Sequence, residues 1–194
     1  MNALAKVPVR LTMAEFLAWE PGDGRKWELV DGEPRAMAPA QAIHSLLQAE
    51  LARLIGNHLL EQGGPCRAAT EAAIVPRVQA NHNLRVPDLV VTCTPGDGDD
   101  GLISAPVLIA EILSPSNQAQ TWSNVWAYTS IPSVQEILVL HSVGIGAEVL
   151  CRGPDGAWPA DTSKVKAGDL VLESIRFRAP LADVYRTTRL RPGA

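Results

Sequence analysis

The sequence contains few cysteines and no long apolar run. Cys66, Cys93 and Cys151 are odd in number and scattered, and they form no CxxC or His/Cys ligand spacing, so structural zinc is not expected. No apolar stretch approaches the roughly 20 residues that span a bilayer, and the first residues contain no uninterrupted apolar segment typical of a signal peptide. We therefore expect a cytoplasmic protein with reduced cysteines and no membrane association.

The composition is that of a globular protein. Of the 194 residues, 46% are hydrophobic and 20% are charged, and no internal repeat or linker is visible, so we expect a single domain over residues 1–194. The net charge of −4 argues against a protein that binds nucleic acid over its whole surface. From residue 164 onward, seven basic residues accompany three acidic ones. Such a bias more often makes a surface soluble than contacts DNA.

Apolar periodicity, turn residues and capping residues predict a mixture of helices and strands. Thr12 and Glu15 have the spacing of a helix-capping box, and Asp31-Gly32 is typical of a hairpin turn. The acidic loop 95–101 lacks the spacing of an EF-hand, so we interpret it as a solvated turn. We expect helices at 12–19, 41–61 and 118–129, hairpins at 26–37 and 137–151, and strands at 66–78, 86–93 and 107–113.

Acidic residues occur in or beside apolar runs. Glu111 lies within the run 107–113, and Asp88 directly precedes another run. Short apolar runs predict strands that are buried on both faces, where charges are rare unless something pairs with them. Two such carboxylates on neighbouring strands, with Glu28 as a candidate third, favour a divalent-metal site. Any one of these acids alone would also fit helix capping or pairing with an arginine.

Several segments together resemble a known family. They resemble the Uma-type restriction endonucleases, a branch of the PD-(D/E)XK nuclease superfamily, over nearly the whole chain. The matching residues are 26–33, His44, 86–88, 111–116, Tyr128, 137–151 and 168–185. This resemblance implies a single-domain α/β fold of the restriction-endonuclease type, in which helices flank a mixed central β-sheet.

The resemblance also implies a set of site residues. Asp88 and Glu111 would be metal-binding carboxylates, Glu28 would complete the acidic cluster, and the backbone carbonyl of Ile112 would be a further ligand. Oxygen ligands of this kind suit Mg²⁺ or Mn²⁺, which would neutralise charge on a DNA phosphodiester and lower the pKa of a water. His44 would orient water or contact a phosphate near these acids. As a lone residue, it equally fits a half-buried histidine on a helix face.

The chain departs from the family pattern at the catalytic lysine. The superfamily's lysine normally follows the strand acid by two positions, where this chain has a leucine. The Uma-type branch supplies the lysine from the next helix, and the matching position here is Asn124. Gln120, Asn124 and Tyr128 have the spacing of one helical stripe, so we expect the geometry to be retained without the charge. Lys26, on the same strand as Glu28, is a weaker substitute.

Three functions therefore remain open from the sequence. The first is a divalent-metal-dependent endonuclease that cleaves DNA, with Asn124 as a weakened substitute for lysine; cutting both strands of a duplex would suit a homodimer. The second is a catalytically inactive nuclease-fold protein with a binding or regulatory role, which the missing lysine and the acidic balance favour. The third is an interaction module whose buried acids pair with arginines such as Arg85 or Arg35.

Overall fold

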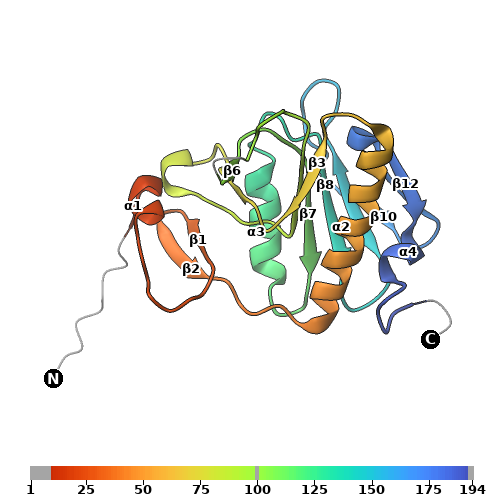
Figure 1. The fold of residues 1–194 in the computed structure, drawn as a ribbon, viewed down its shortest axis with the longest axis horizontal. Helices are drawn as coiled ribbons and strands as arrows, with labels where there is room; N and C mark the ends of the chain where they lie inside the picture. The colour runs from red at the N-terminus through yellow and green to blue at the C-terminus, as the bar shows by residue number, and fades with distance from the viewer. Residues whose placement is uncertain (1–9, 99–100, 192–194) are drawn as a thin grey trace.

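A six-stranded β-sheet forms the centre of the molecule (Figure 1). The structure, a computed structural model, describes residues 10–98 and 101–191. In sheet order the strands are β10 (Ser163–Val165), β9 (Ala147–Cys151), β8 (Glu136–His141), β7 (Pro106–Leu113), β5 (Leu89–Thr92) and β3 (Arg67–Thr70). Strands β7 and β8 pair in parallel and the other neighbours pair antiparallel, which confirms the expected mixed sheet.

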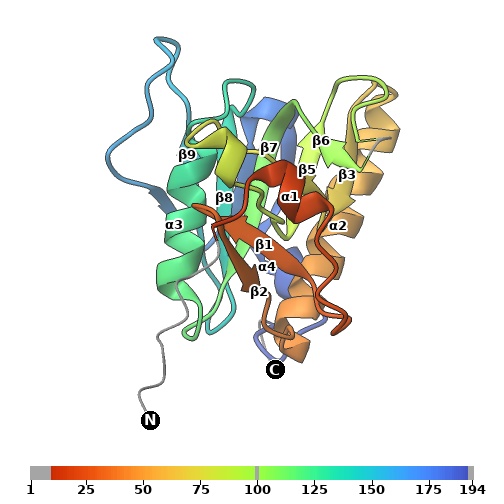
Figure 2. The same cartoon turned by 90° about the vertical axis from the view of Figure 1, so that its left-hand side faces the viewer.

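Helices cover both faces of this sheet. The long helix α2 (Ala42–Gln62) buries Leu47, Leu51 and Ile55 against one face, and α3 (Gln118–Tyr128) packs on the other. Figure 2 shows these two helices on opposite sides of the strands. The remaining elements on the α2 side are β11 (Asp169–Leu172), η2 (Glu173–Ile175), β12 (Phe177–Pro180) and α4 (Leu181–Tyr185). Across the described residues, no helix has the length and apolar character needed to cross a bilayer.

A small N-terminal unit lies beside the sheet. Helix α1 (Met13–Leu17) begins with the expected capping box, and β1 (Trp27–Val30) and β2 (Glu33–Ala36) form the expected hairpin. The amide of Leu29 donates to the carbonyl of Leu84 at 2.9 Å, which fastens the hairpin to the segment that precedes β5. In Figure 2 the hairpin lies in front of the sheet, between α2 and α3. The first residues, for which we expect no signal peptide, lie outside the described part of the chain.

Two expected strands are shorter than their apolar patterns indicate. The expected strand 66–78 divides because Glu71 adopts a φ of 54°, and β4 (Ala73–Ile74) pairs with β6 (Leu102–Ile103) in a separate two-stranded sheet. The segment before β5 forms only isolated bridges, because Pro87 has no amide hydrogen to donate to a ladder. A short turn, η1 (Ala80–His82), connects these segments. Strand β5 itself begins directly after Asp88.

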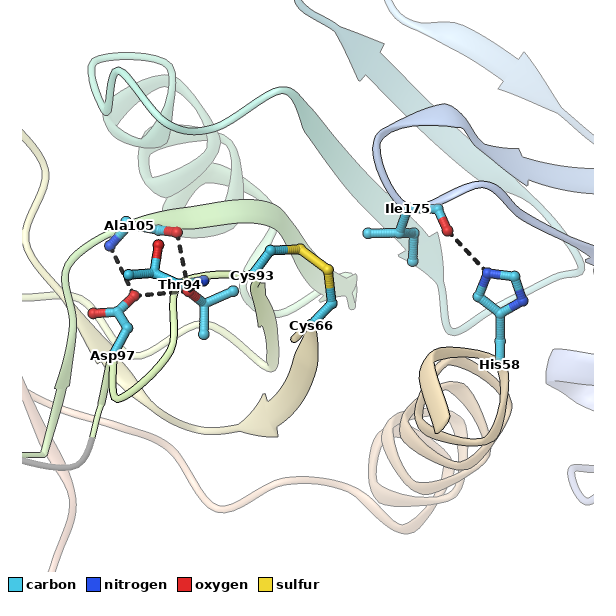
Figure 3. Close-up of a disulfide and its surroundings, with 8 residues drawn as sticks. His58, Cys66, Cys93, Thr94, Asp97, Ala105 and Ile175 are labelled. Carbon is cyan, nitrogen blue, oxygen red and sulfur yellow. Dashed lines mark hydrogen bonds between the residues drawn. A yellow bond between two sulfur atoms is a disulfide. The ribbon is translucent and has the colours of Figure 1, made fainter. Parts of the chain in front are cut away.

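The structure corrects the expectation that all cysteines are reduced. Cys66 and Cys93 form a disulfide, with their Cα atoms 3.8 Å apart (Figure 3). Cys66 directly precedes β3 and Cys93 directly follows β5, and the register pairs Arg67 with Thr92. The two cysteines are therefore cross-strand neighbours although 27 positions separate them in sequence. The exposed Cys151 remains free.

The described part of the acidic loop after β5 forms the expected turn, with Pro95 and Gly96 exposed, but its Asp97 is not solvated. Asp97 is buried, and its carboxylate accepts a hydrogen bond from the amide of Ala105 (Figure 3). It also accepts hydrogen bonds from the hydroxyl of Thr92 and from both the amide and the hydroxyl of Ser104. These bonds lower the pKa of Asp97 in spite of its burial. The carboxylate thus fixes the loop to the start of β7, a structural role in place of a solvated one.

Candidate functional site

The sheet brings Asp88 and Glu111 together. Strand β5 pairs antiparallel with β7, and the register sets Leu89 opposite Ala110. Asp88 precedes Leu89 and Glu111 follows Ala110, so the two acids lie at the same level on adjacent strands. The structure therefore places this pair as the sequence indicates.

Glu111 lies at the buried end of the acidic cluster. Its side chain faces α3, and the hydroxyl of Tyr128 donates to its Oε1 at 2.6 Å. Burial, followed by repulsion from Asp88, raises the pKa of Glu111 well above its usual range, and Glu28 adds to this repulsion. Burial likewise raises the pKa of Tyr128, and the neighbouring Glu111 raises it further. The ionised form of a buried carboxyl with these neighbours would be stabilised by a nearby positive charge.

Asp88 is held by both the helix and the sheet. His44, in the first turn of α2, places its Nε2 at 2.8 Å from Oδ1 of Asp88, and the amide of Ile112 donates to Oδ2 at 2.7 Å. One turn further along α2, Gln48 donates to the backbone carbonyl of Asp88 at 2.9 Å. Of the two interpretations of His44, the one that sets it beside the acids matches this geometry. The structure places Ile112 in the site through its amide contact with Asp88.

Glu28 approaches the same site from the N-terminal hairpin. It is buried, and its Oε1 accepts a hydrogen bond from the amide of Val86 at 2.8 Å. Burial raises the pKa of Glu28, while the Val86 amide, attraction to Arg85 and a hydrogen bond from Asn124 oppose that rise. Glu28 is thus the third acid of the cluster, although it is far from the other two in sequence.

The expected stripe on α3 faces this cluster. Tyr128 contacts Glu111, Asn124 contacts Glu28, and Gln120 donates to Oδ1 of Asn124 at 2.9 Å. The stripe provides hydrogen bonds but no positive charge. Lys26 does not replace the lysine, because its Nζ forms an ion pair with Glu71.

Arginines do not pair directly with the buried acids. Among the described residues, neither Glu28 nor Glu111 forms an ion pair with a lysine or an arginine. Arg85 is almost fully buried, and its guanidinium donates instead to the carbonyl of Leu29 at 2.5 Å. Arg35 donates to Oε1 of Gln120 at 2.8 Å. Among the described residues, these acids therefore have no direct arginine partner, although Arg85 attracts Glu28 without contacting it.

The donor set fits a hard divalent cation. Within residues 10–98 and 101–191, no three His, Cys, Asp or Glu side chains are grouped so that they could hold a metal ion. However, Mg²⁺ is usually bound by one or two carboxylates and keeps several of its waters. The adjacent, mutually repelling carboxylates of Asp88 and Glu111 match that requirement. A cavity of about 480 Å³ is separate from these two acids and lies among α1, β1 and the segment 84–86.

Some contacts in the site were not anticipated from the sequence. Gln48 was missed, although its position four residues after His44 places both on one face of α2, which was an available signal. The contact between Arg35 and Gln120 joins residues 85 positions apart, so no local pattern could reveal it. The same holds for the amide of Val86, which binds Glu28 across 58 positions.

Comparisons with known proteins show the family and the fold of this chain. Residues 13–176 match the model of the Uma2 family, described as "Putative restriction endonuclease". The uncharacterized protein slr1290 from Synechocystis is 31% identical over 180 residues, which cover 91% of this chain and 92% of that protein. The crystal structure of a "putative nuclease" from Anabaena variabilis matches with a TM-score of 0.72 at 19% identity, over 90% of this chain and 97% of that one. The chain therefore belongs to the Uma2 family and has its nuclease-like fold.

Proposed function

We propose that this protein is a divalent-metal-dependent endonuclease that hydrolyses phosphodiester bonds of DNA. The observation that supports this most strongly is the pairing of the buried Glu111 with the half-buried Asp88 at the same level of the sheet, where burial and repulsion from Asp88 hold the pKa of Glu111 well above its usual range. Such a pair is unfavourable in a merely structural core, since a buried charge is normally paired. Family membership and the nuclease-like fold support the same reaction class.

Asp88 and Glu111 would hold Mg²⁺ or Mn²⁺ together with the backbone carbonyl of Ile112, and Glu28 would orient a water near the ion. When bound, the ion would neutralise charge on the scissile phosphate and lower the pKa of the attacking water. The chain's own residues would position these ligands. His44 and the Ile112 amide hold the carboxylate of Asp88, and the hydroxyl of Tyr128 holds Glu111.

Asn124 is proposed to occupy the place of the catalytic lysine. Its uncharged side chain lowers the pKa of Glu28, so it would orient that acid without supplying a positive charge. Loss of one preorganised donor for developing charge typically lowers kcat by about 10²–10³-fold. We therefore expect a slow enzyme.

The absence of a positive charge at Asn124 also favours a second candidate function, that of a catalytically inactive nuclease-fold protein with a binding or regulatory role. In that case the acids would bind a divalent ion without turnover. The two candidates make different predictions for one substitution. If the protein is a slow endonuclease, Asn124→Lys should increase a nicking rate that the wild type already shows. If the protein is an inactive nuclease fold, the wild type should show no nicking, and any activity should appear only in Asn124→Lys.

Nicking of a supercoiled plasmid in Mn²⁺ tests these proposals. The proteins are the wild type, Glu111→Gln, Asn124→Lys and the control Asp161→Asn, which alters an exposed acid between β9 and β10. Wild-type nicking that disappears in Glu111→Gln and persists in Asp161→Asn would support the endonuclease. A silent wild type beside an active Asn124→Lys would support the inactive nuclease fold.

Calorimetric titration with Mn²⁺ completes this test. Mn²⁺ binding without nicking by any of the four proteins would support the binding or regulatory role. Absence of Mn²⁺ binding would contradict both candidates and favour an interaction module.

Two further features belong to the endonuclease proposal. A homodimer would present two sites to the two strands of a duplex, since a two-fold axis in the protein matches that of the DNA. A protein with this activity would meet its DNA substrate in the cytoplasm. Light scattering in solution, with and without a DNA duplex, measures the proposed dimer directly.

A further inference from the structure

The proposed reaction needs positive charge near the phosphate, and α3 does not supply it. Two arginines lie on this side of the site: Arg85 attracts Glu28, and Arg35 lies close enough to Arg85 to repel it. Arg85 is only 2% exposed, and one of its nitrogens is bonded to the carbonyl of Leu29. It therefore fastens the hairpin to the site and is hidden from a substrate.

Arg35 is placed differently. It lies on β2 directly opposite Glu28 in the hairpin register, and its side chain is 48% exposed. One nitrogen, Nη1, donates to Gln120, and Nη2 is 3.7 Å from a carboxylate oxygen of the half-exposed Glu33. Because a guanidinium has five N–H donors, these contacts leave donors for an anion that approaches from solvent.

A chain of hydrogen bonds connects Arg35 to the acidic cluster. Arg35 donates to Oε1 of Gln120, so the amide nitrogen of Gln120 faces Asn124 and donates to its Oδ1. The uncharged side chain of Asn124 in turn acts on Glu28 and lowers the pKa of that acid. The exposed Arg35 thus orients the amide of Gln120, and through it the amide of Asn124, whose nitrogen is left to face the acid.

We propose that Arg35 binds a phosphate of the DNA substrate and supplies, from β2, the positive charge that the lysine position on α3 lacks. This inference rests on the proposed endonuclease function. Arginine suits the role because its planar guanidinium can donate two parallel hydrogen bonds to a phosphate. Through Gln120 and Asn124, Arg35 also acts as a positioning residue for Glu28.

The test measures kcat and KM for plasmid nicking in Mn²⁺ by a set of variants. These are the wild type, Arg35→Gln, Arg35→Lys, Asn124→Lys, the double variant Arg35→Gln/Asn124→Lys, and Glu111→Gln as the inactive reference. Arg178→Gln is the matched control, because Arg178 is also exposed and paired with an acid, but it lies on β12 on the α2 side of the sheet. Thermal unfolding of each variant checks that it folds.

We expect Arg35→Gln to raise KM and lower kcat, with a fall in kcat/KM of about 10–100-fold. Arg35→Lys should recover part of kcat, because lysine keeps the positive charge but lacks the planar guanidinium with its two parallel N–H donors. Adding Asn124→Lys to Arg35→Gln should restore nicking, since a lysine on α3 removes the need for charge from β2. Arg178→Gln should match the wild type.

Results that contradict the role of Arg35 can be distinguished from results that contradict the proposed function. Equal nicking by the wild type and Arg35→Gln, with Glu111→Gln silent, would overturn the role of Arg35 and leave the proposed function standing. A double variant no better than Arg35→Gln alone would overturn the claim that the two positions share one role. A wild type that is silent while Asn124→Lys nicks would show that Arg35 does not replace the lysine. Silence of all variants would overturn both the inference and the proposed function.

Discussion

The hydroxyl of Tyr128 donates a hydrogen bond to Oε1 of Glu111 at 2.6 Å, joining α3 to β7 inside the protein. This bond lowers the pKa of Glu111, in opposition to burial and to repulsion from Asp88. It therefore favours the ionised carboxylate, which is the form that a divalent cation binds.

Tyr128→Phe should weaken Mn²⁺ binding by about 10–100-fold, the usual cost of losing a group that orients a metal ligand. Calorimetric titration at neutral pH measures this change. The matched control is Tyr185→Phe, because the hydroxyl of Tyr185 is also buried but lies within hydrogen-bond distance of the backbone carbonyls of His141 and Gly146, either of which can accept its one hydrogen. Equal Mn²⁺ affinity in the two variants would contradict a role for Tyr128 in the site.

Glu111→Gln should stabilise the metal-free protein, and more so at higher pH. Because the pKa of Glu111 is raised on folding, its favourable contribution is complete below the unfolded-state value near 4.5 and is lost as pH rises through the folded-state pKa. Glutamine does not ionise, so the variant avoids this loss. We expect a gain on the order of 1 kcal/mol or more in the free energy of unfolding.

Urea unfolding in EDTA, from about pH 5 to about pH 8, measures that gain. Glu61→Gln, which alters an exposed acid at the end of α2, should follow the wild type at every pH. If the curves of Glu111→Gln and the wild type ran parallel, the raised pKa would be refuted.

His44→Gln should lower plasmid nicking by about 10–100-fold, because Asp88 loses the side chain that holds its Oδ1. The control lies on the same helix. His58 places its Nε2 at 2.9 Å from the carbonyl of Ile175 (Figure 3). It lies about four helical turns further along α2 than His44, so His58→Gln should keep wild-type nicking. A comparable loss in both variants would mean that His44 acts through the stability of α2 alone.

The disulfide predicts the thiol count and the stability of the protein. Denatured without reductant, the chain should present one titratable thiol, that of Cys151, and after reduction it should present three. Replacing both Cys66 and Cys93 with serine should lower the free energy of unfolding by about 3 kcal/mol, since the bond closes a loop of 27 positions. Cys151→Ser serves as the control. Three thiols in the unreduced chain would show that the bond does not form.

Local patterns were sufficient to predict most of the elements. The β1–β2 hairpin follows from Asp31-Gly32, since both residues have the positive φ that this turn requires, 50° and 85°. Helices α2 and α3 follow from apolar spacing, and the runs around Asp88 and Glu111 indicated strands. These elements could be predicted because each depends on residues only a few positions apart.

The expectations that the structure corrected concern contacts between distant segments. Nothing near Asp97 indicates that it will turn inward to bind the start of β7, and the register of β3 and β5 alone sets Cys66 opposite Cys93. The split between β3 and β4 depends on one backbone angle at Glu71. Each of these outcomes is set by packing and strand pairing, which a sequence pattern does not contain.

The features of the site also separate into those that local sequence patterns predict and those that depend on contacts between distant segments. Residue type and spacing along single elements predicted that acids would lie in or beside buried strands. The family resemblance added the expectations that Asn124 occupies a lysine position and that Glu28 joins the acids. The contacts that bring Glu28 to the site, and that connect Arg35 to Gln120 and Asn124, appear only in the folded chain. The physical reason is that hydrogen bonds and charge interactions depend on distance in space, which is set when the hairpin docks between the two helices.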